Sequence, residues 1–393
     1  DLGGIAGKCY SLSNCTVNCT VIKGSNNTGG IAGESGNISD CSVTCNTIVG
    51  NSNTGGIVGD GGQVSNSYAH CNIEGKDNVG GVTGQSSSSI IGCGFIGDIV
   101  SIGNCVGGLS GNQGGDISKS FAIGNIKTPG DKSGGIAGYS SSNIENSYFS
   151  GSVSGGERVG GIVGDKKDGT VHYNYAKAVL AVRKSVGGLC GYISGHSYYI
   201  NYYNNGTVYA YLNSNIIIAS SIKATEGNVG RIYGVTGEYV TIGAMGTTDE
   251  NKAYNRAIII KAGVAQEIED DDQNGTSVSA STLKYKATYV AMGWDFNDTW
   301  AIQETECYPY MKTQTAPPVI TSKVVSGATV VRGKCIDGGT IIIDIDGVKQ
   351  QLISNNYEFS FDVDPLQAGH EIRISAKSDG KEQSYYTTET IAF

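Results

Sequence analysis

Proline, basic tracts and long apolar runs are scarce in this sequence, and each absence excludes a class of protein. Only 5 of the 393 residues are proline, while 60 are glycine, about twice the ordinary share of glycine. Much glycine with little proline and a fixed repeat favours ordered turns over a disordered linker. The net charge is −9 without any basic tract, so nucleic acid and anionic membranes are poor partners. No apolar run approaches the roughly 18 residues of a membrane-spanning helix.

A short glycine motif recurs at nearly constant spacing through the first half of the chain. Successive copies start 26, 26, 25, 27, 27, 26 and 27 residues apart. The copies are GGIAG at Gly3 and Gly29, GGIVG at Gly55, GGVTG at Gly80, GGLSG at Gly107, GGIAG at Gly134, GGIVG at Gly160 and GGLCG at Gly187. A fixed period of this size is typical of a solenoid or another repeat array.

Each repeat contains three short apolar islands separated by glycine, serine, asparagine and aspartate, which turn the chain. The islands are too short for ordinary helices, and no stripe of helical period is visible. Three short strands in about 26 residues fit one coil of a parallel β-helix, with neighbouring coils stacked about 4.8 Å apart. We therefore predict an all-β fold that begins with a right-handed parallel β-helix.

Stacked coils align equivalent positions, and we expect two ladders of inward-facing residues. The first is Cys15, Cys41, Tyr68, Cys93, Phe121, Tyr148, Tyr175 and Tyr203; the second is Cys19, Cys45 and Cys71, followed by Gly97, Gly124 and Gly151. The 11 cysteines form no C-x-x-C pair, so we expect buried free thiols that behave as small apolar residues. Disulfides between adjacent coils, and metal binding or thiol reactivity, stay open as alternatives.

The repeat becomes irregular after Gly191, and the last part of the chain has a different pattern. We predict an insertion at 195–226, a degenerate ninth copy from Val229 with Tyr254 as its aromatic residue, and a capping segment at 241–316 that closes the solenoid. The prolines before Val319 suggest a short stiff linker. Seven strand-like runs follow, at about 319–325, 329–335, 340–346, 349–354, 358–364, 370–378 and 384–393. They predict a small β-sandwich of immunoglobulin type at 317–393.

The eight G-G-Φ-x-G copies, each followed by a polar island ending in an aromatic residue or cysteine, resemble the GLUG motif of bacterial surface proteins. The resemblance covers about residues 1–240. Residues 317–393 resemble bacterial Ig-like modules, through the stretch Val325–Lys334 and the run from Gly369 to Ile374. Proteins with the GLUG motif include adhesin-like chains and non-catalytic regions of surface enzymes. The resemblance therefore implies an extracellular location, on a bacterial surface or secreted. Because the chain starts at Asp1 inside a repeat, we expect a fragment or mature region.

A cluster of tyrosines in the predicted insertion is the candidate ligand-binding site. Tyrosine rings pack on sugar rings and their hydroxyls form hydrogen bonds, although the same residues could form a small core of the insertion. The candidate residues are Tyr198, Tyr199, Tyr202, Tyr203, Tyr209 and Tyr211.

Other residues give little support for catalysis, a cofactor or a metal. The acids of the repeats, such as Asp60, Asp98 and Asp165, look scattered over different phases of the period, so we expect no pair of carboxylates across a cleft. Asp270 begins a loop that mimics a Ca²⁺ site, but Ser281 stands where the closing glutamate should be, and we expect a solvated acidic turn. The four histidines are dispersed.

We therefore expect a monomeric, non-enzymatic surface protein that binds a glycan or a matrix protein through its extended β-helix. A pure spacer and a non-catalytic accessory region of a larger surface enzyme are the alternatives. A polysaccharide lyase or hydrolase is the remote one.

Overall fold

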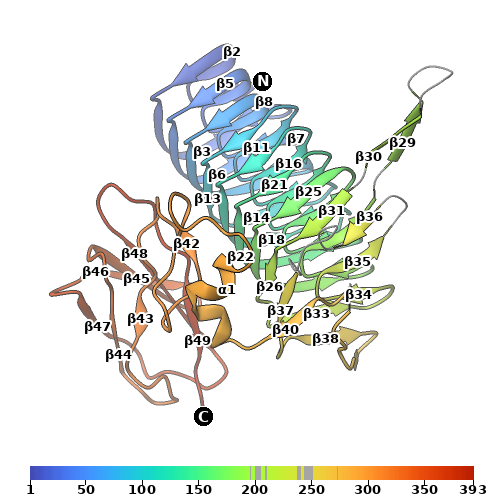
Figure 1. Ribbon diagram of the computed structural model, residues 1–393. Helices are drawn as coiled ribbons and strands as arrows, with labels where there is room; N and C mark the ends of the chain where they lie inside the picture. The colour runs from blue at the N-terminus through green and yellow to red at the C-terminus, as the bar shows by residue number, and fades with distance from the viewer. Residues whose placement is uncertain (195, 200–204, 209, 237–239, 243–250, 272) are drawn as a thin grey trace. The chain divides into compact units, whose positions relative to one another are not determined.

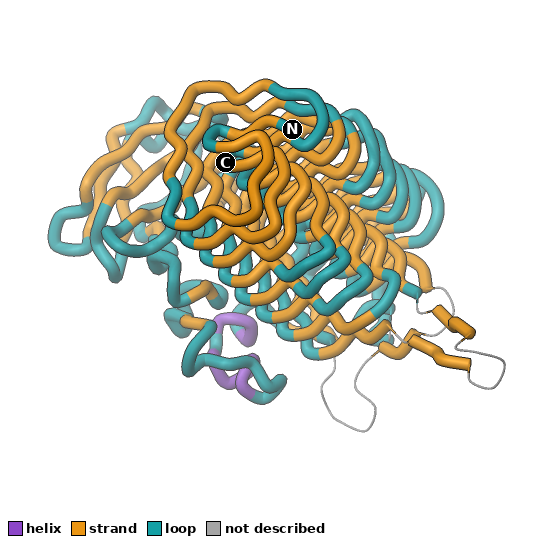
Figure 2. The backbone as a smooth tube through the Cα atoms, turned by 90° about the horizontal axis from the view of Figure 1, so that it is seen from above, coloured by secondary structure: helices purple, strands orange, loops and turns teal. Residues whose placement is uncertain are grey.

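The protein is described by a computed structural model of residues 1–194, 196–199, 205–208, 210–236, 240–242, 251–271 and 273–393. It consists of two compact units, Asp1–Ser279 and Ala280–Phe393, and each is described by itself. Unit 1 is a parallel β-solenoid, so the predicted fold class is confirmed. Figure 1 shows its coils stacked in chain order, and Figure 2 looks at the same stack from above.

Three parallel sheets run the length of the solenoid, and each coil adds strands to all three. Sheet A comprises β1 (Leu2–Gly3), β4 (Thr28–Gly29), β7 (Ser52–Gly55), β10 (Asp77–Gly80), β15 (Val106–Gly107), β19 (Ser133–Gly134), β23 (Val159–Gly160), β27 (Val186–Gly187) and β34 (Val229–Gly230). Sheet B comprises β2 (Ala6–Ser13), β5 (Ala32–Ser39), β8 (Val58–Ser65), β11 (Thr83–Ser86), β12 (Ile90–Ile91), β16 (Ser110–Gln113), β17 (Ile117–Ser118), β20 (Ala137–Ser140), β21 (Ile144–Glu145), β24 (Val163–Lys166), β25 (Gly169–His172), β28 (Cys190–Ile193), β31 (Ala210–Asn213), β35 (Tyr233–Thr236) and β36 (Val240–Ile242). Sheet C comprises β3 (Thr16–Lys23), β6 (Ser42–Val49), β9 (Tyr68–Gly75), β13 (Gly94–Ile96), β14 (Ile99–Ser101), β18 (Phe121–Lys127), β22 (Tyr148–Gly155), β26 (Tyr175–Val182), β32 (Ile216–Ile217), β33 (Ser221–Ala224), β37 (Lys252–Tyr254), β38 (Ile258–Lys261), β39 (Val264–Ala265) and β40 (Thr276–Val278).

The Gly-Gly pair forms the tightest corner of each coil. The first glycine of every pair stacks on the first glycine of the next coil, from Gly3 to Gly230. The second glycine has no room for a side chain, because a Cβ atom there would lie 2.0–2.4 Å from a backbone carbonyl oxygen of the next coil. The repeated motif is thus required by the close approach of neighbouring backbones.

The ninth copy of the motif departs from this rule, because Arg231 replaces its second glycine. The Arg231 side chain is fully buried. Its guanidinium donates to the Asp270 carboxylate at 3.0 Å, to the Gly275 carbonyl at 2.9 Å and to the Ser277 hydroxyl at 2.8 Å. The loop around Asp270 therefore covers this corner of coil nine in place of a further glycine pair.

A ladder of small polar residues lies at the corner between sheets B and C. Its members are Cys15, Cys41, Ser67, Cys93, Ser120, Ser147, Asn174, Asn215 and Asn251. Each side chain from Cys15 to Asn174 donates to the carbonyl two residues earlier in its own coil. Backbone N–H groups reach the side chain of the next coil, as Cys93 does to Ser120 at 3.0 Å. The ladder thereby supplies hydrogen-bond partners to the backbone groups of these turns.

The aromatic residues predicted for this ladder lie one position further along the chain, so that part of the first predicted ladder is wrong. The aromatic residues share one register position in sheet C. The order along this position is Tyr68, Gly94, Phe121, Tyr148, Tyr175 and Ile216. The Phe121–Tyr148 and Tyr148–Tyr175 ring centroids lie 5.7 and 4.8 Å apart.

The physical reason for this shift is that the corner position must donate a hydrogen bond to its own turn. The aromatic side chains therefore occupy the next position along the chain, in the strand. For the same reason Lys252, and not Tyr254, follows Ile216 in this register. Tyr203 lies outside the described residues.

The second predicted ladder is present. Cys19 pairs in register with Cys45, and Gly124 pairs with Gly151. A Cβ atom at either glycine would lie 1.8 Å from a carbonyl oxygen of the preceding coil. A register irregularity between Thr44 and Thr47 interrupts the column before Cys71.

The predicted insertion contains a separate hairpin. Strand β29 (His196–Tyr199) pairs antiparallel with β30 (Asn205–Val208), apart from the three solenoid sheets (Figure 1). The chain then returns to the solenoid, since β31 pairs with β25 and both β32 and β33 pair with β26.

The last part of unit 2 contains two small antiparallel sheets, and their seven strands from β43 to β49 match the seven predicted runs. One sheet has the order β43 (Val319–Ile320), β44 (Val330–Lys334), β47 (Glu358–Asp362). The other has the order β46 (Val348–Ile353), β45 (Thr340–Ile345), β48 (Glu371–Lys377), β49 (Thr387–Thr390). Residues from both sheets, including Phe359 and Ile374, form one hydrophobic core.

The segment that precedes these sheets belongs to the same unit. It contains a 3₁₀ turn (Thr282–Lys284), α1 (Lys286–Val290) and the short pair β41 (Trp300–Ala301) and β42 (Tyr310–Met311). Residues 314–318 of the expected linker are buried, and the Thr315 N–H donates at 2.7 Å to the Glu382 carbonyl, in the segment between β48 and β49. The role of residues 241–316 as a solenoid cap stays a prediction.

Across the described residues, no helix is both long enough and apolar enough to span a membrane.

The glycine corner predicts a strong effect of adding a single methyl group. In Gly108→Ala the Cβ atom would lie 2.0 Å from the Gly135 carbonyl oxygen, so neighbouring coils must separate. We expect a loss of about 3 kcal/mol in unfolding free energy, seen as a lower midpoint in chemical denaturation. Gly114→Ala is the control, because its nearest neighbour would be 3.3 Å away. Equal midpoints for the two variants would contradict the packing argument.

The polar ladder predicts that hydrogen bonding, not polarity as such, selects its residues. Ser120→Ala leaves the buried Cys93 N–H without its acceptor and should lower the unfolding free energy by about 1–3 kcal/mol. Ser120→Cys should be tolerated much better, because cysteine already occupies the same position in other coils. Thermal unfolding of both variants followed by circular dichroism checks this. If the cysteine variant is as unstable as the alanine variant, the ladder is not a hydrogen-bonding requirement.

Candidate functional site

The predicted tyrosine site falls mostly outside what the structure describes. Tyr202, Tyr203 and Tyr209 lie outside the described residues. Tyr198 and Tyr199 lie on strand β29 of the hairpin, and Tyr211 lies on strand β31 of sheet B, opposite Thr170. The backbone therefore separates Tyr211 from the hairpin pair, and the site stays a prediction.

A row of polar and aromatic side chains along sheet B is the candidate site that the structure adds. One residue of each of the first eight coils occupies the same register position, and we call these eight residues the outer row; apolar Val235 follows in the ninth coil. They are Lys8, Glu34, Asp60, Gln85, Asn112, Tyr139, Asp165 and Tyr192. Most are partly exposed, whereas the next residue of coils two to eight is buried. The expectation that the acids lie at different phases of the period is wrong for Asp60 and Asp165, which share this register position.

The first coils of the outer row carry charge. The Lys8 ammonium lies 2.6 Å from the Glu34 carboxylate, in a partly exposed ion pair. Partial burial, and secondly the charge of Glu34 one coil away, raise the pKa of Asp60. Two carboxylates from adjacent coils thus present acceptor oxygens side by side, followed by the amides of Gln85 and Asn112.

The later coils of the outer row form a cluster of tyrosines and cations around one carboxylate. Asp165 lies between Tyr139 and Tyr192 in register, and its side chain is only 7% exposed. Arg158 binds this carboxylate at 2.6 Å and Lys132 at 3.3 Å. The same cations lie over the flanking rings, with Arg158 4.7 Å from the centroid of Tyr192 and Lys132 5.1 Å from that of Tyr139. The five side chains hold one another in fixed positions.

Both cations come from a column of turn residues with left-handed backbone. The column contains Asn27, Asn53, Asn78, Cys105, Lys132 and Arg158, all with positive φ. Its asparagines are linked by side-chain hydrogen bonds of 2.9 Å, and Asn78 also donates to Gln85 of the outer row at 3.4 Å. Three residues of this column, Asn78, Lys132 and Arg158, therefore contact the outer row directly.

The acidic loop near Asp270 is hydrogen-bonded to the solenoid through Arg231 and Ser277. Two hydrogen bonds from Ser277, and then Arg231, lower the pKa of Asp270. The Asp271 carboxylate accepts from the backbone and side chain of Asn274, at 2.7 and 2.9 Å. Within the described ranges, no three His, Cys, Asp or Glu side chains gather as a metal site.

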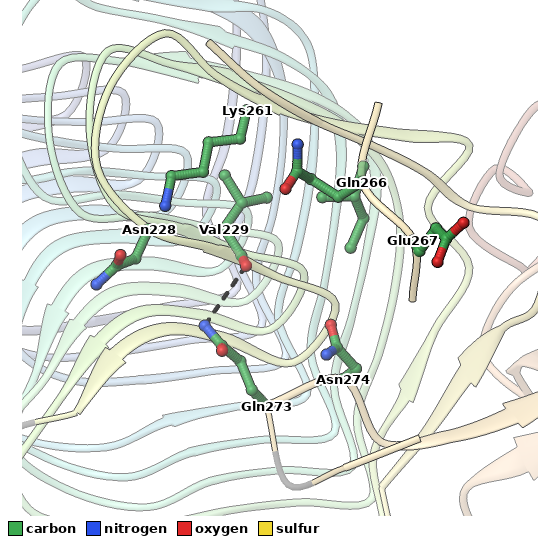
Figure 3. Close-up of a pocket in the computed structure, with 8 residues that line it drawn as sticks. Asn228, Val229, Lys261, Gln266, Glu267, Gln273 and Asn274 are labelled. Atoms are coloured by element: carbon green, nitrogen blue, oxygen red, sulfur yellow. Dashed lines mark hydrogen bonds between the residues drawn. The ribbon is translucent and has the colours of Figure 1, made fainter. Parts of the chain in front are cut away.

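A polar pocket of about 280 Å³ lies near the last coils of the solenoid, at the lower end of the size range of ligand sites. Figure 3 shows Asn228 and Lys261 on one side of Val229, and Gln266 and Glu267 on the other. The Gln273 amide donates to the Val229 carbonyl at 3.4 Å, and Asn274 completes the lining (Figure 3). Amides and one charge of each sign suit a small polar molecule.

Lys166, next to Asp165 in the chain, is a lysine in the solenoid interior. It occupies the inward position after the outer row, with no exposed surface. Its ammonium donates to the Ser140 hydroxyl at 3.3 Å and to the Ser142 carbonyl. Burial lowers the pKa of Lys166 to about 7, although Cys190, Asp168 and Asp116 act in the opposite direction. Neither the periodicity nor the composition of the sequence revealed this residue.

Comparison with known proteins finds no matching family model, curated protein or solved structure. Fold and site therefore define a class only, namely a parallel β-solenoid with a polar and aromatic row along one sheet.

The buried lysine predicts a specific dependence of stability on pH. Between about pH 7 and 10 the unfolded chain binds a proton that folded Lys166 does not, so this residue makes stability rise with pH in that window. Lys166→Met should raise the thermal midpoint at pH 7, through a gain of a few kcal/mol, and the gain should shrink toward pH 10. Lys167→Met, at the exposed neighbouring position, is the control. A gain that does not vary with pH would contradict the assignment.

Proposed function

We propose that the solenoid is a non-catalytic extracellular rod that binds a neutral glycan chain along the outer row. The observation that carries the proposal is the register itself. Eight polar or aromatic side chains stand one coil apart, at about 4.8 Å, and all of them except Asp165 are at least partly exposed. A polymer of repeated sugar units can occupy several coils at once, so weak contacts add up along the row.

The chemistry of the outer row suits hydroxyl-rich ligands. Carboxylates such as Asp60 accept hydrogen bonds, and the amides of Gln85 and Asn112 both donate and accept. Tyr139 and Tyr192 supply aromatic surface and phenolic hydroxyls. The net charge of −9, with Glu34 and Asp60 in the row, disfavours sulfated or otherwise polyanionic chains.

Rigidity of the solenoid supports the same proposal. Backbone hydrogen bonds hold each strand of the row to two neighbours, and the asparagine column fixes the adjacent turn. A ligand therefore does not have to order the site, which favours binding. The resemblance to GLUG-repeat surface proteins supports an extracellular, adhesive role, with an Ig-like unit 2 that displays the rod.

A double substitution in the middle of the outer row tests the proposal. Gln85→Ala with Asn112→Ala removes two amides that face solvent in adjacent coils. We expect the dissociation constant for a bound neutral glycan to rise about tenfold, since two hydrogen bonds of ordinary strength are lost. The measurement is a glycan array followed by calorimetric titration of the best ligand.

Matched controls locate the site. Asn18→Ala with Asn46→Ala removes two exposed amides of sheet C and should leave affinity unchanged. A glycan whose binding survives the outer-row change but is lost in Tyr198→Ala with Tyr199→Ala would move the site to the hairpin. Loss only in Lys261→Ala with Gln266→Ala would move it to the pocket. Binding to matrix proteins without any glycan would replace the proposal by its protein-binding alternative.

A further inference from the structure

Two cysteines of adjacent coils lie in direct sulfur contact inside sheet C. Cys19 on strand β3 and Cys45 on strand β6 are paired in register. Their Sγ atoms lie 2.9 Å apart, with the Cys19 thiol donating to the Cys45 sulfur. Neighbouring in-register strands place Cα atoms about 4.8 Å apart, inside the range of about 4.4–6.8 Å found across disulfides.

The neighbouring cysteines are placed differently. The thiols of Cys15 and Cys41 donate to carbonyls of their own turns, at 3.3 and 3.1 Å, as members of the polar ladder. Cys71 follows Cys45 in the column across the register irregularity between Thr44 and Thr47, and Cys45 and Cys19 both contribute to the raised pKa of the Cys71 thiol, after burial. The pair in direct sulfur contact is Cys19 and Cys45, at 2.9 Å.

We propose that Cys19 and Cys45 form a disulfide that cross-links the first two coils when the protein meets an oxidising disulfide donor. The Cys19 thiolate attacks one sulfur of the donor and releases the first donor thiol. The Cys45 thiolate then attacks the mixed disulfide at the Cys19 sulfur and releases the second. The two cysteines lose two protons and two electrons, and the donor disulfide is reduced to two thiols.

The cross-link would join strands that already stack, so little backbone movement is required. It restricts the unfolded chain between the two cysteines and thereby favours the folded coils. The proposal is independent of glycan binding, because neither cysteine belongs to the outer row.

The test counts free thiols in the full chain. Reduced protein is incubated with glutathione disulfide at about pH 9, because burial and contact with Cys45 raise the pKa of Cys19 to about 11 and the thiolate is the reacting form. Free thiols are then alkylated under denaturing conditions and counted by intact mass. We expect the count to fall from 11 to 9, a loss of two, and fragment spectra to join Cys19 to Cys45.

Variants separate this pair from the other cysteines. Cys45→Ser and Cys19→Ser should each form no internal disulfide, whereas Cys93→Ser should lose two thiols as the unmodified chain does. The oxidised chain should also unfold at a higher temperature than its reduced form, a difference that both pair variants lack. Retention of all thiols, glutathione adducts without an internal link, or a link that maps to another pair would each overturn the proposal.

Discussion

The distance between stacked backbones is the constraint on which unit 1 depends. Each coil must meet the next at hydrogen-bonding distance in three sheets at once, and the chain must turn between them. At one corner the turn leaves no space beyond a hydrogen atom, which explains the column of second glycines from Gly4 to Gly188. At another corner the backbone leaves room for a small side chain, and the Ser, Cys and Asn ladder supplies hydrogen bonds to the turns there.

Much of the fold could be predicted because this constraint imposes a nearly constant repeat length on the sequence. The glycine pairs set the coil length, and the islands between them mark the strands. The seven strands from Val319 onward could be predicted equally well, since hairpin turns and the alternation of apolar and polar residues are local signals. What could not be read was the register within an island. In the sequence, Cys41 and Tyr68 look like equivalent apolar positions of successive coils. In the structure, the Cys41 thiol donates a hydrogen bond to a carbonyl of its own turn, whereas Tyr68 lies one position later and begins strand β9.

The candidate site was harder to predict, because its residues share a position and not a chemical type. Lys8, Gln85 and Tyr192 occupy one row, but only the distance of each from its glycine pair reveals this. A count from that pair would have aligned Asp60 with Asp165, at five residues after the first glycine in each case. The same count, one residue later, places Lys166 at a position that is buried in coils two to eight, but the residue type itself gives no indication of burial.

Arg231 has a consequence for how such a chain can change in length. In each coil before Arg231 the corner is a glycine pair, which lets the backbone of the next coil approach closely. An additional repeat of the same length could therefore stack at such a corner and lengthen the solenoid by one coil. After Arg231 that corner is filled by a guanidinium bonded to Asp270 and Gly275. A repeat added directly after Arg231 would therefore have to displace the Asp270 loop before it could stack, whereas a repeat added at a glycine corner would not.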